Sequence, residues 1–358
     1  MKQPEIIIPR IVVRRRRPPR PRIGARVSAH YMRWELGRYR ERLTAGPGGI
    51  GRRGIWTPER AAEQHNMVLD NAFELVSTAG FSKLNMYAAV GTGSTAPSAS
   101  DTTLEAETAP SGGSPPSGES DTITEDTSSY TYTIQRVREF SEADVGGKNL
   151  AEWGWRPSSS GTLMSRELFR DDNGNPITLT LDADQKLRLI YSIAVQVAPA
   201  AESGQAQTFS LTNYGDFNGQ WWVARFNAKA PLQLADFLAI GQGSCYTCGG
   251  VGAYWMALTG SMQPGDGKNP SKVDYQNTVG LAYEPYAAGS RKRTVSEITV
   301  GTDKWNQDIY GIVIGIHGSG GVVWSDMDGV YFDFGGHFTK DNLHKLIFNQ
   351  FDGISWGP

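Results

Sequence analysis

Regular alternation of apolar and polar residues fills most of the chain beyond residue 130 and predicts β-strands. The stretch 130–137 (YTYTIQRV) changes character at every second residue, the period of a strand with one buried face. Residues 186–198 (KLRLIYSIAVQVA) form the longest apolar run, which predicts a central strand. The same patterns predict further strands at 162–169, 177–181, 207–212, 220–226, 294–300, 309–316, 321–325, 329–334 and 345–356.

Turn signals between these runs predict antiparallel pairing. Asn173-Gly174 separates 162–169 from 177–181, and Asp328-Gly329 separates 321–325 from 329–334, which predicts two hairpins. No segment repeats at a fixed period, which disfavours a solenoid or a propeller. Eight to ten antiparallel strands close most naturally as two packed sheets. We therefore expect a mainly β protein, an antiparallel β-sandwich of jelly-roll or Greek-key type.

One amphipathic helix is predicted ahead of this β region and is expected to pack on the sandwich. Thr57 suits a helix N-cap, Pro58 suits the first helical position, and Gly80 suits the end. Between them, apolar or weakly polar residues recur at helical spacing: His65, Leu69, Ala72 and Val76. A short strand is expected at 84–90, a glycine turn at 91–93, and a second helix at 231–240.

Charge divides the chain into a basic beginning and an acidic remainder. The 358 residues carry a net charge of −2, yet residues 1–60 hold 16 of the 35 Lys and Arg and only 4 of the 37 Asp and Glu. The other 298 residues therefore hold 19 basic and 33 acidic side chains. The net charge is thus about +12 in residues 1–60 and about −14 in residues 61–358. This asymmetry indicates two ends with different partners, or the arm of one copy on the body of a neighbour.

Residues 1–56 are predicted to form an extended basic arm, and residues 57–358 the body. Prolines between the arginines favour extended geometry, and residues 31–43 are interpreted as a short amphipathic helix with arginines outward. Three interpretations of the arm remain open: docking on an acidic neighbouring subunit, contact with nucleic acid, or a solvated tail. The predicted partner-docking residues are Arg14, Arg15, Arg16, Arg17, Arg20, Arg22, Trp34 and Tyr39.

Residues 94–129 are rich in Ser, Thr, Pro, Gly and acids, and are expected to form a mobile surface loop of the body. The tryptophans further along raise a different question, because exposed indole rings stack on sugars. Aromatic residues on strands more often belong to a core or an interface. The candidate glycan contacts are Trp221, Trp222 and Trp255.

Several chemical motifs are incomplete. Gly91-Thr92-Gly93 follows a predicted strand as in a dinucleotide site, but Pro97 and a polar run follow where a phosphate-binding helix must begin. The loop 171–175 (DDNGN) lacks the glycine and glutamate positions of an EF-hand and is interpreted as a hairpin tip. Cys245 and Cys248 have metal or redox spacing without a second ligand pair, so packed thiols are the preferred interpretation.

No serine lies in a nucleophile elbow, and no run of about 18 apolar residues predicts a membrane span. We therefore predict no catalytic residues, no metal site, no cofactor and no membrane insertion. The N-terminus lacks a secretory pattern, which favours synthesis in the cytoplasm.

A set of short stretches is distinctive when taken together: 66–70 (NMVLD), 88–97 (AAVGTGSTAP), 101–104 (DTTL), 137–140 (VREF), 150–155 (LAEWGW), 165–169 (SRELF), 186–197, 346–348 (LIF) and 355–356 (SW). They span most of residues 57–358, whereas the basic arm lies outside the pattern. In these stretches the chain resembles structural proteins of tailed bacteriophage particles.

The resemblance implies a non-enzymatic virion component of the tail, neck, collar or fibre attachment. It implies a symmetric homo-oligomer with other virion proteins as partners, and a place in the virion after synthesis in the bacterial cytoplasm. A nucleic acid bound by the basic arm would then be packaged DNA. The alternative is a tail module that binds a host receptor or glycan through the tryptophan-rich loops.

Overall fold

The computed structural model describes most of the chain. Strands make up 52% of the residues and helices 9%, so sheets rather than helices build the core. The mainly β expectation is thus confirmed, with several antiparallel sheets. The residues described are 23–46, 49–198, 205–211, 214–224, 230–240, 252–261, 272–274, 277, 279–280, 282–296, 298–317, 328–343, 345–348 and 351–358.

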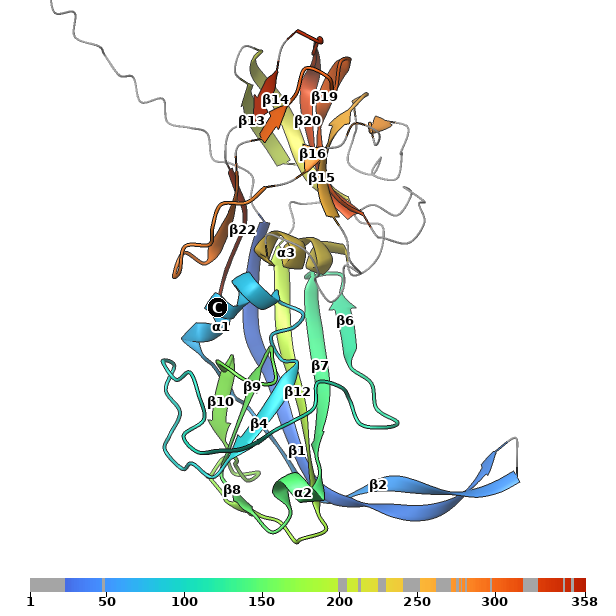
Figure 1. The fold of residues 1–358 in the computed structure, drawn as a ribbon, viewed down its shortest axis with the longest axis vertical. Helices are drawn as coiled ribbons and strands as arrows, with labels where there is room; N and C mark the ends of the chain where they lie inside the picture. The colour runs from blue at the N-terminus through green and yellow to red at the C-terminus, as the bar shows by residue number, and fades with distance from the viewer. Residues whose placement is uncertain are drawn as a thin grey trace, which may run out of the picture.

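Three larger sheets and two short strand pairs contain the strands (Figure 1). The large sheet has the order β17 (Lys292–Val295), β22 (Phe351–Gly357), β1 (Ile23–Gly46), β12 (Lys186–Ala198), β7 (Thr131–Phe140), β6 (Thr122–Asp126), with β2 (Gly49–Gln64) also paired to β1. The small sheet has the order β3 (Met67–Val68), β10 (Ser165–Leu168), β9 (Glu152–Arg156), β4 (Tyr87–Gly91), β5 (Glu107–Pro110).

The upper sheet has the order β13 (Gln205–Leu211), β14 (Gly215–Ala224), β20 (Asp328–Thr339), β19 (Asp308–His317), β15 (Gly252–Leu258), β16 (Val279–Gly280). The short pairs are β11 (Leu179–Thr180) with β8 (Asn149–Leu150), and β18 (Ile298–Val300) with β21 (Leu346–Phe348). The helices of the described residues are α1 (Asp70–Ala79), α2 (Glu142–Val145) and α3 (Ala230–Ile240).

Aromatic rings join the large and small sheets into the lower lobe. Tyr191 of β12 stacks on Trp155 of β9 with ring centroids 5.2 Å apart, and it meets Trp153 edge-on at 6.0 Å. All three side chains are fully buried. Burying such large rings removes much apolar surface from water, so this contact is a main source of stability for the lobe.

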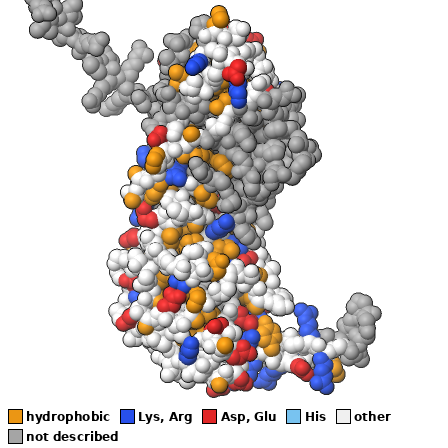
Figure 2. All heavy atoms as spheres, viewed as in Figure 1, with side chains coloured by type: hydrophobic (Ala, Val, Ile, Leu, Met, Phe, Trp, Pro, Cys, Tyr) orange, Lys and Arg blue, Asp and Glu red, His pale blue; other side chains and the backbone are white. Residues whose placement is uncertain are grey.

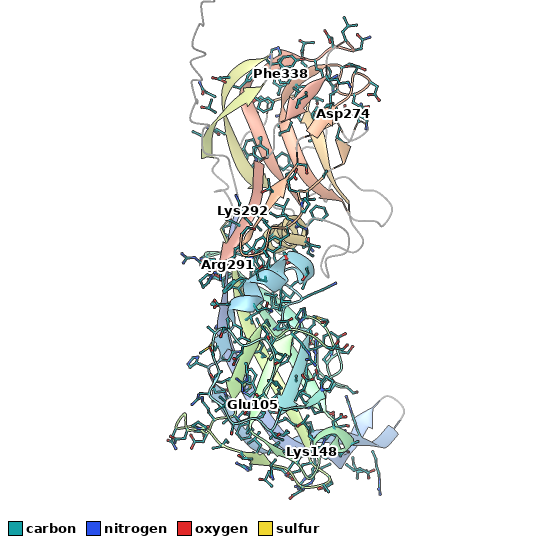
Figure 3. The ribbon with its side chains drawn as sticks, turned by 60° about the vertical axis from the view of Figure 1, so that its left-hand side comes forward. Glu105, Lys148, Asp274, Arg291, Lys292 and Phe338 are labelled. Carbon is teal, nitrogen blue, oxygen red and sulfur yellow. The ribbon has the colours of Figure 1, made fainter. Side chains whose placement is uncertain are left out.

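Helix α3 lies between the lower lobe and the lobe built on the upper sheet (Figure 1). Its Asp236 is fully buried and accepts hydrogen bonds from the Phe81 amide at 2.5 Å and from Ser82. Burial raises the pKa of the Asp236 carboxyl to about 6. Arg293 donates to the Ile240 carbonyl at 2.6 Å and so satisfies one of the carbonyls at the C-terminal end of the helix. Figure 3 shows Arg291 and Lys292 at this level, with Phe338 in the upper lobe.

Several predicted elements are confirmed. Strands β7 and β12 match the predictions at 130–137 and 186–198, with β12 between β1 and β7. Helix α3 matches the prediction at 231–240, and Gly80 ends α1 with a positive φ of 73°. The hairpin predicted between 321–325 and 329–334 involves residues outside the described part of the chain.

The predicted helix starting at Thr57 is wrong, because residues 57–64 belong to strand β2 and α1 begins only at Asp70. The predicted helix at 31–43 is also wrong, since this stretch is the middle of β1. Strand pairing explains both differences. β1 hydrogen-bonds to β12, β2 and β22, and these contacts outweigh the weak local preference for helix. The predicted boundary at residue 57 therefore falls inside a strand of the large sheet.

Residues 94–129, expected to be a loop, contain two paired strands, β5 in the small sheet and β6 in the large sheet, and the turn before β5 is held by a buried carboxylate. The fully buried Glu152 accepts hydrogen bonds from the amides of Gly93, Glu105 and Ala106 at 3.1, 3.0 and 2.8 Å, and its carboxylate lies 2.9 Å from Arg166. Figure 3 shows Glu105 on this flank. The glycine turn therefore does cradle an anion, but the anion is the chain's own carboxylate.

Replacing Glu152 by Gln is expected to lower the free energy of unfolding by about 2 kcal/mol. The change removes one of the two carboxylates that pair closely with the buried Arg166, the other being Asp101, and it also removes the charge that the three amides face. Urea unfolding measures the loss. Glu63→Gln is the control, since Glu63 is exposed and 3.5 Å from Arg33, and it should change stability by less than about 0.5 kcal/mol. Equal losses in the two variants would contradict this role of Glu152.

Candidate partner-docking hairpin

Strand β1 is far longer than its neighbour β12, and the excess leaves the lower lobe. The 24 residues of β1 pair with β12 only from Gly24 to Gly37, whereas residues 38–46 pair with β2 alone. We call the described residues of 38–57, which are 38–46 and 49–57, the projecting hairpin; it extends sideways from the base of the lower lobe (Figure 1). An isolated two-stranded ribbon is at best marginally stable in water, so this one needs support at its base or a partner along its length.

A β-bulge lies where the hairpin leaves the sheet. Leu36 pairs with Arg60 but the next residue, Gly37, pairs with Pro58, which leaves Glu59 as the extra residue. A Cβ atom added at Gly37 would collide with the Thr57 carbonyl and lie 2.9 Å from the Pro58 Cα, so only glycine fits. A bulge bends its strand and increases the local twist. Residues 57–59 therefore direct the hairpin away from the sheet.

An ion cluster fixes the base of the hairpin to the body. Arg38 binds Asp182 at 2.7 Å and Asp184 at 2.8 Å in the turn before β12, and it also binds Glu59 at the bulge. Glu59 in turn lies 3.0 Å from Arg40. Networks of several charges hold geometry better than single exposed pairs do. The cluster therefore sets the direction in which the hairpin points.

An aromatic clamp adds a second attachment on the opposite face. The Arg188 guanidinium of β12 lies 4.2 Å from the Trp56 ring centroid and donates to the Tyr39 hydroxyl at 2.6 Å. It also donates to Glu139 at 2.7 Å, and Trp56 donates to Glu35 at 2.8 Å. Because Arg188 is only 3% exposed, this cation–π contact is largely shielded from water.

The outer part of the hairpin has one arginine face and one mixed face, on which the ion pair of Glu41 and Arg52 lies beside apolar side chains. Residues directly opposite in an antiparallel pair point to the same side. Arg40 and Arg42 therefore share a face with Arg53, which pairs with Arg42, while Tyr39 and Leu43 lie on the other face. The Leu43 side chain is 73% exposed. Figure 2 shows Lys and Arg side chains gathered along the hairpin.

The predicted docking residues are only partly brought together here. Tyr39 lies on the projecting hairpin, but Trp34 is 2% exposed and meets Phe169 edge-on, with its indole donating to the Arg170 carbonyl at 3.2 Å. As a core residue of its own chain, Trp34 has no surface for a partner, and its assignment to docking was wrong. The remaining predicted docking residues lie outside the described residues: Arg14, Arg15, Arg16, Arg17, Arg20 and Arg22.

The candidate glycan contacts do not form an exposed aromatic surface in the described part. Trp222 is 1% exposed and stacks on Tyr331 at 6.0 Å, so its ring faces are not accessible to a sugar, which corrects that prediction. Trp221 and Trp255 lie in β14 and β15, but their side chains are outside the described part.

The other candidate chemical sites have structural roles wherever the structure describes them. The Asp171 carboxylate accepts from the amides of Asn173 and Asn175 at 2.9 Å each, in a tight turn closed by the bridge between Arg170 and Pro176. The expected hairpin does not continue as a strand pair, because β10 pairs with β3 and β9, and β11 pairs with β8. No group of three or more His, Cys, Asp or Glu suited to a metal occurs among the described residues. Cys245 and Cys248 lie outside them. None of the helices that the structure describes is long and apolar enough to cross a membrane.

Sequence reasoning missed Gly37, Glu59, Arg53 and Arg188. One signal was present: arginines at 38, 40 and 42 alternate with other residues at the period of a strand, as Tyr39 and Leu43 do on the opposite face. The roles of Glu59 and Arg188 depend on contacts over long sequence separations, which no local pattern records.

Comparison with protein-family models, with curated proteins and with solved structures finds no match. The function proposed for this chain therefore rests on the hairpin's geometry together with the resemblance in its sequence.

Gly37→Ala is expected to destabilise the protein by about 2 kcal/mol, because overpacking at a backbone contact forces the strands to shift. Hydrogen exchange should show faster exchange in residues 38–57 than in β12. Gly24→Ala is the matched control on the same strand, where an added Cβ has open space and stability should hold. Unchanged exchange in the hairpin of Gly37→Ala would contradict the role of the bulge.

The hairpin base should weaken in acid. Hydrogen bonds from Gln185, Arg38 and Arg40 lower the pKa of Glu59 to about 2. Because the folded pKa lies below the ordinary value of 4.5, the contribution of Glu59 is fully present above pH 4.5 and is lost as the pH falls toward 2. A carbon-13 titration of the Glu59 carboxyl should give a midpoint near the lower value. A midpoint near 4.5 would show that the cluster does not form.

Proposed function

We propose that this protein is a non-enzymatic structural subunit of a tailed bacteriophage particle, placed in the tail, the neck or collar, or the fibre attachment. In this proposal it forms a symmetric oligomer in which each projecting hairpin docks on a neighbouring subunit. The docking contact that the sequence predicted for the whole basic arm is thus assigned to the hairpin. Other virion proteins are the remaining partners.

The observation that carries the proposal is the preorganised hairpin. Two attachments hold residues 38–57 in one direction, while Leu43 exposes an apolar side chain and Arg42 and Arg53 expose charges. Ordering a flexible segment on binding costs free energy, and a preordered segment avoids that cost. A ribbon held rigidly outside its own core therefore suits insertion into a neighbour better than it suits a free surface.

A jelly-roll or Greek-key connection of the lower lobe belongs to the same proposal. The face-to-face packing of the large and small sheets through Tyr191, Trp153 and Trp155 supports a sandwich. The alternative of glycan binding gains no support from the described residues, because the Trp222 ring is enclosed by its own lobe.

Replacing residues 39–56 by an Asn-Gly turn should convert the oligomer to monomers while leaving the rest of the fold intact. Asn-Gly suits a two-residue hairpin turn and keeps Arg38 and Thr57 paired. Sedimentation velocity gives the oligomeric state, and circular dichroism verifies the fold. The full chain should also co-sediment with purified tailed phage particles.

Deletion of residues 1–22 is the control for this experiment, because it removes basic charge but leaves the hairpin. The oligomer should survive that deletion. An oligomer that persists without the hairpin would overturn its role in docking, and a full chain that remains monomeric and is absent from particles would overturn the structural function itself.

A further inference from the structure

The outer arginines of the projecting hairpin are arranged in a way that opposes folding of the isolated chain. Arg42 and Arg53 are directly opposite each other in the β1–β2 pair, and their side chains lie on the same face. Both residues are exposed. Like charges in this position repel, so the arrangement is destabilising unless an anion lies against them.

Ion pairing along the arginine face stops before this pair. Arg38 and Arg40 lie within 3.0 Å of carboxylates at the base of the hairpin. Within the described residues, no carboxylate lies within the 4.0 Å of an ion pair from Arg42 or Arg53. Arg53 passes the loop at Gly118, but the carboxylate beside it, Glu119, already binds Arg188 at 3.1 Å. The inner half of the face is therefore neutralised and the outer half is not.

We propose that Arg42 and Arg53 bind surface carboxylates on the body of a second copy of this chain. This inference rests on the proposed docking function and identifies the partner and the chemistry of the contact. At the base of the hairpin, the arginines pair with Glu59, Asp182 and Asp184 of the same chain. In the outer part, carboxylates of the second copy pair with the arginines in the same way. Desolvated in such an interface, the arginines make charge-assisted hydrogen bonds, for which the planar guanidinium is well suited.

The opposite face of the hairpin favours a protein partner over a nucleic acid. Leu43 is 73% exposed and Tyr39 is 36% exposed, and apolar and aromatic side chains of this kind are typical of protein interfaces. Glu41 and Arg52 lie on that face too, 3.1 Å apart, and because their charges cancel, the face offers no net positive charge to a phosphate backbone. With two unpaired arginines, the face also offers fewer contacts than the six to ten phosphates that a salt-sensitive DNA site neutralises.

Charge complementarity favours a second copy as the partner. Residues 61–358 carry 33 acidic and 19 basic side chains, whereas the hairpin region is basic. The hairpin extends sideways from its own lower lobe (Figure 1), and the nearby Glu119 of that lobe is already paired with Arg188, so further carboxylates for the outer arginines must come from another subunit. A contact between two different surfaces of identical chains is heterologous, and it generates a ring when the rotation between subunits closes.

Charge reversal in the full-length chain tests the contact. Arg42→Glu with Arg53→Glu should raise the dissociation constant of the oligomer at least about tenfold, because carboxylates then face carboxylates. Arg42→Lys with Arg53→Lys keeps the charge and should stay within about threefold of the parent, losing only the bidentate geometry. Arg26→Glu changes an exposed arginine of β1 outside the hairpin and serves as the control. Analytical ultracentrifugation measures all four proteins.

The lysine variant also locates the partner. A zero-length carbodiimide cross-linker joins amines to carboxylates in contact, and a mixture of nitrogen-15-labelled parent with unlabelled lysine variant distinguishes links between copies from links within one. Cross-links from positions 42 or 53 to carboxylates of labelled chains are expected. An oligomer unaffected by charge reversal, with no such cross-link, would overturn the inference while leaving hairpin docking intact.

A parent chain that is monomeric at every concentration would instead overturn the docking function as well. A nucleic-acid partner predicts a third pattern: a fluorescent 30-base-pair duplex binds the parent, binding is lost on charge reversal, and the oligomer is unchanged. That result would overturn the assignment to a second copy. The expected result is duplex binding that does not differ between the parent and the charge-reversed chain.

Discussion

A difference in length between two paired strands determines the form of this molecule. Strand β1 has 24 residues and β12 has 13, so the sheet supports β1 only as far as Gly37. Beyond that point β1 has β2 as its one partner among the described strands. Everything proposed about function follows from this overhang, because a ribbon outside the core must gain its stability from attachments at its base and from what it binds.

Each attachment of the ribbon to the body uses a different kind of contact. The bulge at Gly37 and Pro58 bends the ribbon, the carboxylates around Arg38 hold one face, and Arg188 between Tyr39 and Trp56 holds the other. These contacts restrict the direction of the ribbon and so lower the entropy lost when it docks. The outer arginines contribute nothing comparable within one chain. Their repulsion is consistent with a segment whose stability is completed by a neighbour.

The sequence predicted those parts of the fold in which local pattern and final packing agree. β12 is largely apolar and lies between two strands, and α3 is a largely apolar helix enclosed between two lobes. Prediction failed where tertiary contacts reversed a local signal: Thr57 and Pro58 resemble a helix start but form the edge of a bulge. The anion held at Gly93 was also unpredictable, because Glu152 is 59 residues away in the chain.

A cryo-electron microscopy reconstruction of the assembled full-length protein tests the central claim most directly. The account predicts that residues 38–57 of each subunit lie on the body of the adjacent subunit, with Arg42 and Arg53 facing its carboxylates. The ribbon should keep the direction that the bulge and the ion cluster give it. Assemblies in which the hairpins extend into solvent, or in which subunits meet through other surfaces alone, would contradict the account.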